Sequence, residues 1–511
     1  MSPSNLEFRH WTIVTARLRR LSLGSSVLMF LSGCAVGPDF QPPSAPSVSS
    51  FLPTAHDDRA GSAPLDGLKL VSGAEVPAQW WELLRSDGLN QLVREAIAHN
   101  SDLTAAEAAV RVARANALAQ RGALFPSVDA MLDANRQKIA VAPTVDPSTG
   151  ETSTGPSRYS VVTRQVSVSF APDIWGGTRR QIESADAEVE LQAFQREGVY
   201  LTLASNVALA AIEEARLRGQ IDATNRVIAL QTKLLSILRR QFEIGHIASS
   251  DVMTQETALA QSRLALPPLV QSLATQRHLL AFLTGRFPAD PPSPTFRLAA
   301  FGLPRALPLS VPGDLIRQRP DVRAAEASLH EANAQIGAAI ADRLPQITLS
   351  ANIGRTSSNA PDLSPSGAMW QVGSHLAQKV FDAGTLAYKQ RAAEEGASRS
   401  FAQYRSVVLA AFQNVADALS ALRSDSQAIA AATAAESSAR RNVELIQRQL
   451  EQGLVNVPIV IEAQRAYLDT TTALVDARAS RFADTVALFQ ALGGGWWNRR
   501  DAKSHAAAAA L

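Results

Sequence analysis

The sequence of 511 residues lacks several features that are typical of other classes of protein. It contains one cysteine, so no internal disulfide framework can form. Aromatic residues make up only 6%, and the formal net charge of +2 provides no strongly basic surface for nucleic acid. Because no run of about 18 apolar residues is present, no transmembrane helix is predicted.

Catalytic and metal-binding motifs are also missing from the sequence. The eight histidines show no HExxH spacing, no cysteine–histidine cluster exists, and no glycine-rich loop precedes a helix to hold a phosphate. Gly493–Gly495 follows a predicted helix, so it is interpreted as a helix terminator. We therefore predict a protein that is not an enzyme and has no cofactor.

The first 33 residues have the pattern of a secretory signal. The basic residues at its start are Arg9, His10, Arg17, Arg19 and Arg20. The apolar run that follows, 21–30, is too short for a bilayer, which needs about 20 residues. Leu31–Cys34 (Leu-Ser-Gly-Cys) resembles a bacterial lipobox. The resemblance implies cleavage before Cys34 and its acylation, and Ala35 in place of aspartate implies sorting to the outer membrane. The alternative is an ordinary buried cysteine.

Residues 35–79 are rich in proline, serine and glycine, and we predict an extended tether with little regular structure. The ordered part should begin at Trp80-Trp81. A short helix is predicted over 88–97 and a longer one over 102–124, where Pro126 would end it.

Two pairs of segments alternate apolar and polar residues with the two-residue period of a strand. In the first pair, 127–137 is followed by 162–170 after a loop at 140–157. In the second pair, 346–353 is followed by 370–379. Each pair is predicted to form a hairpin whose strands have one apolar and one polar face.

Very long helices are predicted between the hairpins and after them. No proline occurs from Gly177 to Arg240, and about 64 helical residues would extend about 96 Å. A second proline-free stretch spans Ala383 to Val457. Further helices are predicted over 249–283, 321–343 and 458–492. Pro267-Pro268 should kink or break the helix that contains it.

The order of these elements occurs twice, which indicates an internal duplication. Arg240–Gly245 (RQFEIG) recurs 208 residues later as Arg448–Gly453 (RQLEQG). Gly177-Thr178 at a strand-to-helix junction matches Gly384-Thr385. The predicted domains are a signal peptide at 1–33, a lipidated tether at 34–87, a first repeat at 88–287 (hairpin about 127–170), a linker at 288–313, a second repeat at 314–495 (hairpin about 346–379) and a C-terminal tail at 496–511.

The predicted strands are long enough to cross a membrane when tilted, at about ten residues each. Four strands cannot close a barrel, and an open edge in lipid leaves backbone groups unpaired at several kcal/mol each. Several chains must then share one barrel, and three would supply twelve strands. The predicted fold class is mainly α with a small membrane β-barrel. The alternative is a soluble four-stranded sheet with one wet face, against which the long helices argue.

Several tracts in the right order resemble one family. They are Cys34–Pro43, Leu303-Pro304, Arg319–Glu326, Ala332–Gly337 and Ala491–Trp497. Over nearly all of the mature chain, the sequence is similar to the TolC/OprM-type outer-membrane factors, in their lipoprotein (NodT-like) branch. The resemblance implies a homotrimer in which a twelve-stranded outer-membrane barrel stands on a periplasmic α-barrel. It also implies two partners, a periplasmic adaptor (membrane fusion) protein and an inner-membrane transporter, usually of the resistance-nodulation-division (RND) type.

The function implied by the resemblance is the outer-membrane exit duct of a tripartite efflux pump, which conducts drugs or toxic small molecules passively. Without a catalytic constellation, the energy must come from a partner. One alternative is a type I protein-secretion duct. Another is a periplasmic coiled-coil adaptor lipoprotein without a pore, although an adaptor would not need two hairpins at matching places in a repeat.

The resemblance further implies a gate at the periplasmic tip, where the helix turns around Gly245 and Gly453 lie. An acidic ring and an arginine three residues later match Glu462 and Arg465. The preceding apolar gate position matches Pro458. The family aspartate six residues past the first turn glycine matches Asp251.

A threefold carboxylate ring in a narrow pore repels itself and attracts cations. Arg465 lies one helical turn from Glu462 on the same face, so it can neutralise the ring within or between chains. The alternative is an exposed pair worth about 0.5 kcal/mol or less. The sequence departs from the family pattern twice, because glutamate replaces the usual aspartate and Pro458, a residue tolerated at a helix start, replaces an apolar side chain.

Overall fold

The chain divides into two compact units, which we describe separately. Unit 1 comprises Met1–Pro42, Val112–Val189 and Ala327–Phe401, and unit 2 comprises Pro43–Arg111, Glu190–Glu326 and Ala402–Leu511. Cys34 and the predicted signal at 1–33 lie outside the described residues. The computed structural model describes residues 35–48, 50–51, 69–138, 144–145, 148–150, 152–153, 158–290, 294–304, 306–357 and 367–499.

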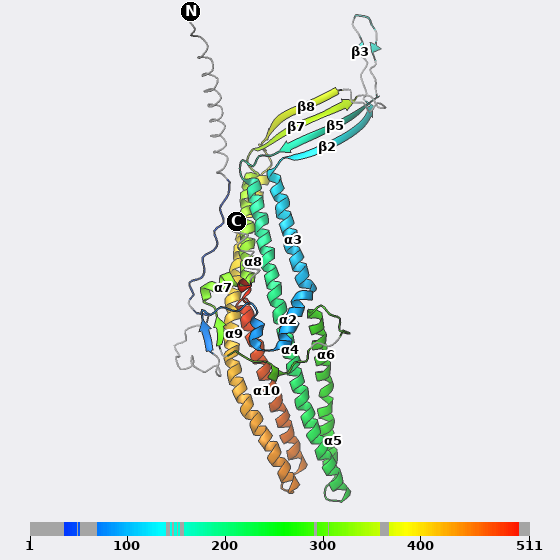
Figure 1. Ribbon diagram of the computed structural model, residues 1–511, viewed down its shortest axis with the longest axis vertical. Coiled ribbons are helices and arrows are strands. Elements are labelled where there is room, and N and C mark those ends of the chain that lie inside the picture. The colour runs from blue at the N-terminus through cyan, green and yellow to red at the C-terminus, as the bar shows by residue number, and fades with distance from the viewer. Residues whose placement is uncertain are drawn as a thin grey trace, which may run out of the picture. The chain divides into compact units, whose positions relative to one another are not determined.

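The described residues are mainly helical (Figure 1). The α-helices are α2 (Asp87–His99), α3 (Ser101–Arg121), α4 (Gly177–Glu243), α5 (Ser249–Leu264), α6 (Leu266–Leu283), α7 (Pro312–Gln318), α8 (Pro320–Ala341), α9 (Thr385–Glu451) and α10 (Val457–Ala491). The strands are β1 (Lys69–Ser72), β2 (Ser127–Lys138), β3 (Thr144–Val145), β4 (Thr152–Ser153), β5 (Arg158–Phe170), β6 (Ala306–Leu309), β7 (Gln346–Ser357) and β8 (Gly367–Ala377).

The two longest helices, α4 and α9, contain 67 residues each. At 1.5 Å per residue each is about 100 Å long, so the prediction from the proline-free stretches is confirmed. Gly219 lies inside α4 and does not end it. It faces Val475 of α10, whose Cγ1 would lie 2.9 Å from a Cβ added at Gly219. The glycine therefore permits a close helix–helix approach.

Both long helices begin beside an aspartate that caps their first turn. The Asp173 carboxylate accepts hydrogen bonds from the backbone N–H groups of Thr178 at 3.0 Å and Arg179 at 2.9 Å. The Asp382 carboxylate accepts from Leu386 and Gly384, each at 2.9 Å. These bonds lower the pKa of Asp382, and the bond from Leu386 has the largest effect. Such carboxylates satisfy the free N–H groups of a helix N-terminus.

The long helices end in matching glycine turns. Gly245 and Gly453 have φ values of 78° and 71°, in the left-handed region that glycine adopts without strain. After each glycine, the next residue donates its N–H back into the helix, from His246 to Gln241 O and from Leu454 to Gln449 O, both at 2.9 Å. The expected break at Pro267-Pro268 is also confirmed, since α5 ends at Leu264 and α6 begins at Leu266.

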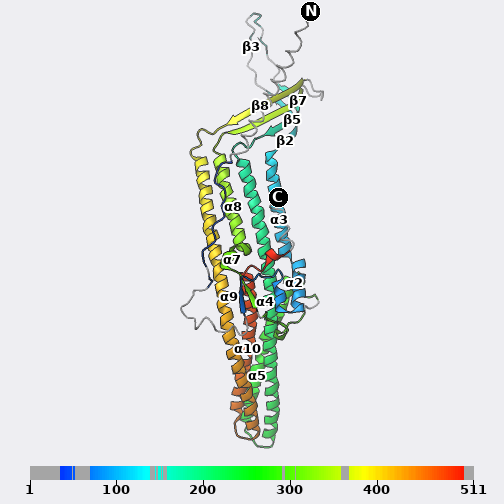
Figure 2. The ribbon, with the colours of Figure 1, turned by 60° about the vertical axis from the view of Figure 1, so that its left-hand side comes forward.

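In unit 1, four long strands form one antiparallel sheet in the order β2-β5-β7-β8 (Figure 2). The predicted pairing within each hairpin, β2 with β5 and β7 with β8, is confirmed. The central pairing of β5 with β7 joins the two repeats. Within the described residues of the protomer, β2 and β8 each keep one edge without a partner strand.

The register places mostly apolar side chains on one face of the sheet and mostly polar ones on the other, with Arg164 and Arg355 paired on the apolar face. Residues directly opposite each other share a face, because successive side chains alternate along a strand. One row across the four strands is Ala130, Val166, Ile353 and Trp370, and the adjacent row on the other face is Asp129, Ser167, Asn352 and Gln371. The apolar row is exposed in the protomer, with Trp370 at 76%.

The prediction that residues 35–79 have little regular structure is wrong at β1. β1 pairs in parallel with β6, so part of the tether and part of the proline-rich link form a small sheet in unit 2. Residues 35–42 are held by side chains of α4 and α8 in unit 1. The amino-acid composition of a segment predicts how little secondary structure it forms. It does not predict whether the segment packs against another helix or strand.

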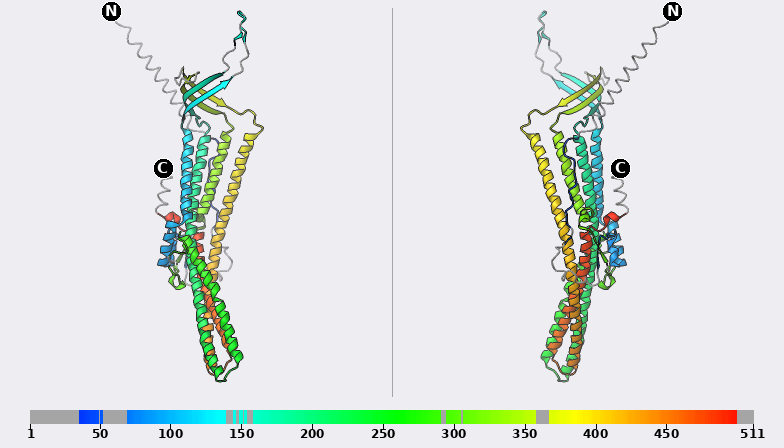
Figure 3. Two further views of the ribbon diagram at one scale, coloured as in Figure 1. Left: turned by 90° about the vertical axis from the view of Figure 1, so that its right-hand side faces the viewer. Right: turned by 90° about the vertical axis from the view of Figure 1, so that its left-hand side faces the viewer.

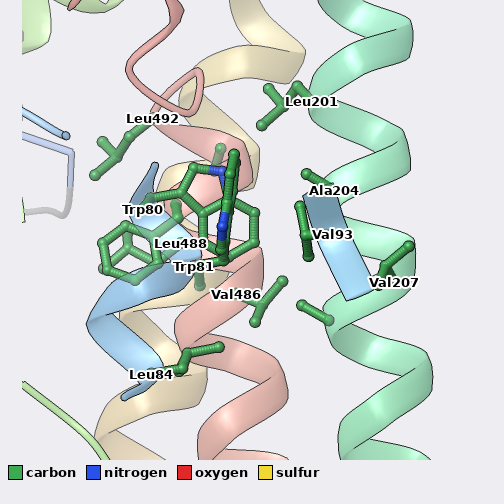
Figure 4. Close-up of a cluster of buried hydrophobic side chains, with 14 of the residues drawn as sticks. Trp80, Trp81, Leu84, Val93, Leu201, Ala204, Val207, Val486, Leu488 and Leu492 are labelled. Atoms are coloured by element: carbon green, nitrogen blue, oxygen red, sulfur yellow. The ribbon is translucent and has the colours of Figure 1, made fainter. Parts of the chain in front are cut away.

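Buried apolar side chains form the core of unit 2. The largest members of the main cluster, Trp80 and Trp81, are each 1% exposed and pack among α2, α4 and α10 (Figure 4). A smaller cluster lies near the glycine turns. Among the described residues, both apolar clusters belong to unit 2. No helix in the described ranges is long and apolar enough to cross a membrane.

Candidate functional site at the helix turns

The two glycine turns lie at one end of unit 2 (Figure 3), and the second apolar cluster lies near them. Its buried members are Leu234, Leu238, Val457 and Val460. Partly buried residues packed against them come from α5, α9, α10 and the two turns, and are Ile247, Val252, Ile446, Leu450, Val455 and Ile461. Ile247 of the first turn and Val455 of the second therefore pack against the same apolar cluster within one chain.

Three of the four predicted gate residues share a single exposed stripe of α10. Pro458, Glu462 and Arg465 are all exposed, whereas Val460 and Ala463 between them are buried. Their spacing of four and three residues places them on one helix face. Pro458 lies in the first turn of α10, where the missing N–H has no intrahelical partner to lose.

Glu462 and Arg465 form no ion pair with each other among the described residues of the single chain. Both side chains therefore face away from the protomer's own core. Asp251 lies on a different helix, in the first turn of α5, where it is half-buried. A carboxylate at this position is favoured by the partial positive charge of the helix N-terminus.

Sequence reasoning missed an ion pair that connects the two helices of the first turn. Arg239 of α4 lies 2.7 Å from Glu256 of α5, and both side chains are largely exposed. Exposed pairs of this kind contribute about 0.2–1 kcal/mol. Only the fold brings these residues together, because the turn reverses the chain between them.

Buried amides lie further along the same helices. Gln255 and Gln464 are 0% exposed, and Gln255 Nε2 donates to Gln231 O at 3.0 Å. Neither polar atom of the Gln464 side chain has a hydrogen-bond partner among the described residues. An unsatisfied buried polar group costs about 1–3 kcal/mol, so the packing at this level is weaker than an apolar contact would be.

A second polar site joins α9 to α10. Asp425, 7% exposed, is hydrogen-bonded to Asp484 on the facing helix. Burial raises the pKa of Asp425 to about 7, and the hydrogen bond and negative charge of Asp484 add to the effect while Arg481 opposes it. Arg481 itself donates to Leu422 O at 2.9 Å and to Ser426 Oγ. These residues lie up to 62 positions apart in the sequence, so helical periodicity alone could not pair them.

This carboxyl pair predicts a stability that depends on pH. The pKa of Asp425 is about 7 in the folded chain and about 4 in an unfolded one, so the folded state holds an extra proton between these values. The free energy of unfolding therefore falls as the pH rises from about 4 to about 7. At about pH 8, Asp425→Asn should melt several degrees above the wild type, whereas the two should agree near pH 4.

The matched control is Asp417→Asn, which removes an exposed carboxylate from the same helix. Its melting temperature should follow the wild-type pH profile. Circular dichroism of the purified protein provides the measurement. A wild-type melting temperature that stays constant between about pH 4 and about pH 8 would contradict a shared proton at this site.

The duplicated unit of β-hairpin and long paired helices has the fold of solved outer membrane channels. The fold is similar to that of the Campylobacter jejuni CmeC outer membrane channel, with a TM-score of 0.81 at 20% sequence identity, over 93% of this chain and 98% of that chain. The chain belongs to the outer membrane efflux protein family, whose sequence pattern matches residues 92–286 and 311–494.

Two relatives from Pseudomonas putida extend over most of the sequence. The pyoverdine export outer membrane protein OpmQ is 29% identical over 440 residues, covering 85% of this chain and 93% of that protein. The toluene efflux pump outer membrane protein TtgF is 28% identical over 487 residues, covering 94% and 97%. The protein is therefore an outer-membrane efflux protein.

Proposed function

We propose that three copies of the chain form the outer-membrane exit duct of a tripartite efflux pump. The four-stranded sheet carries this proposal. Its apolar face suits contact with lipid, and its two open edges would leave backbone groups unpaired in a membrane unless neighbouring copies pair with them. Three sheets joined edge to edge give a closed barrel of twelve strands, whose polar face lines a water-filled channel.

The helices of the three copies then enclose the periplasmic part of the duct, which the helix turns close. Glu462 and Arg465 lie on the exposed stripe of α10, so threefold symmetry converts them into a ring of alternating charges. Pairs between chains hold the ring closed, and Asp251 adds a second set of carboxylates. Pro458 fixes the start of α10 below this ring.

The conducted molecules are small, as the names of the pyoverdine and toluene relatives support. Conduction is passive, and the energy comes from an inner-membrane transporter of the RND type that is joined to the duct by a periplasmic adaptor protein. Planar-bilayer recording of the purified trimer tests the proposal. Discrete conductance steps are expected, and a protein that gives no conductance even when Glu462 and Arg465 are replaced would overturn it.

Acylated Cys34 supplies an additional anchor in the outer membrane. Because twelve strands already hold the trimer in lipid, Cys34→Ala behind a cleavable signal should still give membrane-inserted trimer, in reduced amount. Membrane fractionation and crosslinking provide the measurement, with the wild-type lipoprotein as the control. A fully soluble product that retains activity would contradict the barrel.

A further inference from the structure

We infer that α4 and α8 form a binding site for an extended peptide, and that residues 35–42, the N-terminal strap, occupy it and fasten the two repeats of unit 1 together. This role is separate from the lipid attached at Cys34 and from conduction. All parts of the site, α4 up to Val189, α8 from Ala327 and the strap, belong to unit 1.

Arg180 of α4 makes the main polar contacts to the strap. It is 5% exposed, and its Nε and Nη2 donate to Val36 O at 3.1 Å and Gly37 O at 3.2 Å. The same guanidinium lies 2.7 Å from Asp39 of the strap. Val36 in turn donates its backbone N–H to Trp175 O at 2.9 Å. Charge-assisted bonds to a buried arginine are stronger than neutral ones, so Arg180 fixes the strap on the first repeat.

Side chains of α8 hold the strap from the second repeat. The rings of Phe40 and His330 are stacked, with centroids 4.4 Å apart. Asn333 Nδ2 donates to Pro38 O at 3.1 Å. His330 Nε2 also lies 2.9 Å from Glu183 Oε1 on α4, and Glu183 lies 2.7 Å from Arg180. The strap therefore contacts both α4 and α8. The side chains that bind it, Arg180 and His330, are also connected to each other through Glu183.

Glycines allow the backbones to come this close. Gly37 has a φ of 95°, and a Cβ at this residue would overlap Gly337 Cα of α8. A Cβ at Gly337 would lie 2.8 Å from Val36 O and 2.7 Å from Arg180 Cγ. At the start of the strap, a Cβ at Gly176 would lie 2.5 Å from Ala35 Cα. The site therefore selects a peptide with glycine at the third of its eight positions.

Contacts made by the strap should contribute more to the stability of unit 1 than to that of unit 2. Among the described residues, the buried apolar clusters lie in unit 2, where they hold helices of both repeats together. In unit 1, the strap supplies hydrogen bonds and an ion pair to Arg180 of α4 and an aromatic stack on His330 of α8. Its release should therefore loosen the contact between α4 and α8 in unit 1.

Hydrogen–deuterium exchange of the purified full-length protein tests this inference. The Val36 amide of the strap, which donates to Trp175 O, should exchange slowly in the wild type, and Gly337→Ala should accelerate its exchange by about tenfold or more. The matched control is Gly396→Ala, a helical glycine of unit 1 with nothing within 4 Å of an added Cβ. This control should leave strap exchange unchanged. Exchange in the wild type at the rate of an unstructured peptide, or equal rates in both variants, would overturn the inference.

A second experiment does not depend on the folding of the Gly337 variant. A chain that lacks residues 35–42 should bind a fluorescent synthetic peptide with the sequence of these residues, as measured by anisotropy. Peptides that carry Gly37→Val or Asp39→Lys should bind about tenfold more weakly or worse, because the first overlaps α8 and the second meets Arg180. Equal binding of the three peptides would show that no specific site exists.

Discussion

Replacing both Glu462 and Arg465 by alanine should raise the conductance of the purified trimer in planar bilayers by about three- to a hundredfold. Each exposed charge pair contributes about 0.2–1 kcal/mol, and three symmetric copies together contribute about 0.6–3 kcal/mol to the closed state. Every 1.4 kcal/mol changes the ratio of open to closed duct about tenfold. Removing both charges also avoids an unpaired carboxylate ring, which alone would hold cations in the pore.

The matched control removes one arginine and one glutamate from the same end of unit 2. Arg239→Ala with Glu256→Ala deletes an ion pair within a single chain, so conductance should stay near the wild-type value. Either single charge reversal, Glu462→Arg or Arg465→Glu, should open the duct and raise its conductance. The double variant that exchanges the two residues should return the conductance to near the wild-type value. Conductance that does not change in the double alanine variant would place the gate elsewhere.

The strands could be predicted from the sequence because alternation along a strand is a local signal. Residues 127–137 and 346–353 have the two-residue period, and both form strands. The pairing of β5 with β7 could not be predicted, because alternation defines the face of a side chain but not the neighbouring strand. Only the register shows that Val166 and Ile353 lie side by side on a continuous apolar face.

The long helices were also predictable, since the absence of proline over such lengths leaves few alternatives to a helix. Contacts between helices were not. Asp425 and Asp484 lie 59 residues apart, and neither has a local pattern that distinguishes it from a solvated aspartate. The identification of Glu462 and Arg465 came from a resemblance, and their role in gating stays a prediction.

The strap illustrates why low regularity is a poor guide to docking. Its prolines and glycine predict a loose tether. The absence of a Cβ at Gly37 is nevertheless what allows the strap backbone to approach Gly337 of α8. The contacts of Arg180 become visible only when α4 and residues 36–39 are placed together. Sequence patterns report the backbone preference of a segment, whereas its partner is decided by the tertiary fold.

The core of unit 2 should be the most sensitive part of the chain to a single substitution. Trp80 is 1% exposed and stacks on Phe489 of α10 with ring centroids 5.5 Å apart, while Trp81 lies edge-on at 5.9 Å. The surrounding side chains come from segments far apart in the sequence (Figure 4). Trp80 therefore joins the segment that precedes the first repeat to the final helix of the second.

Trp80→Ala should lower the free energy of unfolding by about 3–5 kcal/mol, because it removes the buried ring and leaves a cavity that rigid helices cannot fill. Urea unfolding of the purified protein, followed by circular dichroism, measures the loss. Trp80→Phe should lose less, since it keeps an aromatic stack on Phe489. Phe287→Ala removes an aromatic ring that is 78% exposed and serves as the control, with an expected change within about 0.5 kcal/mol. A loss below about 1 kcal/mol for Trp80→Ala would mean that the joint between the N-terminal segment and α10 does not stabilise unit 2.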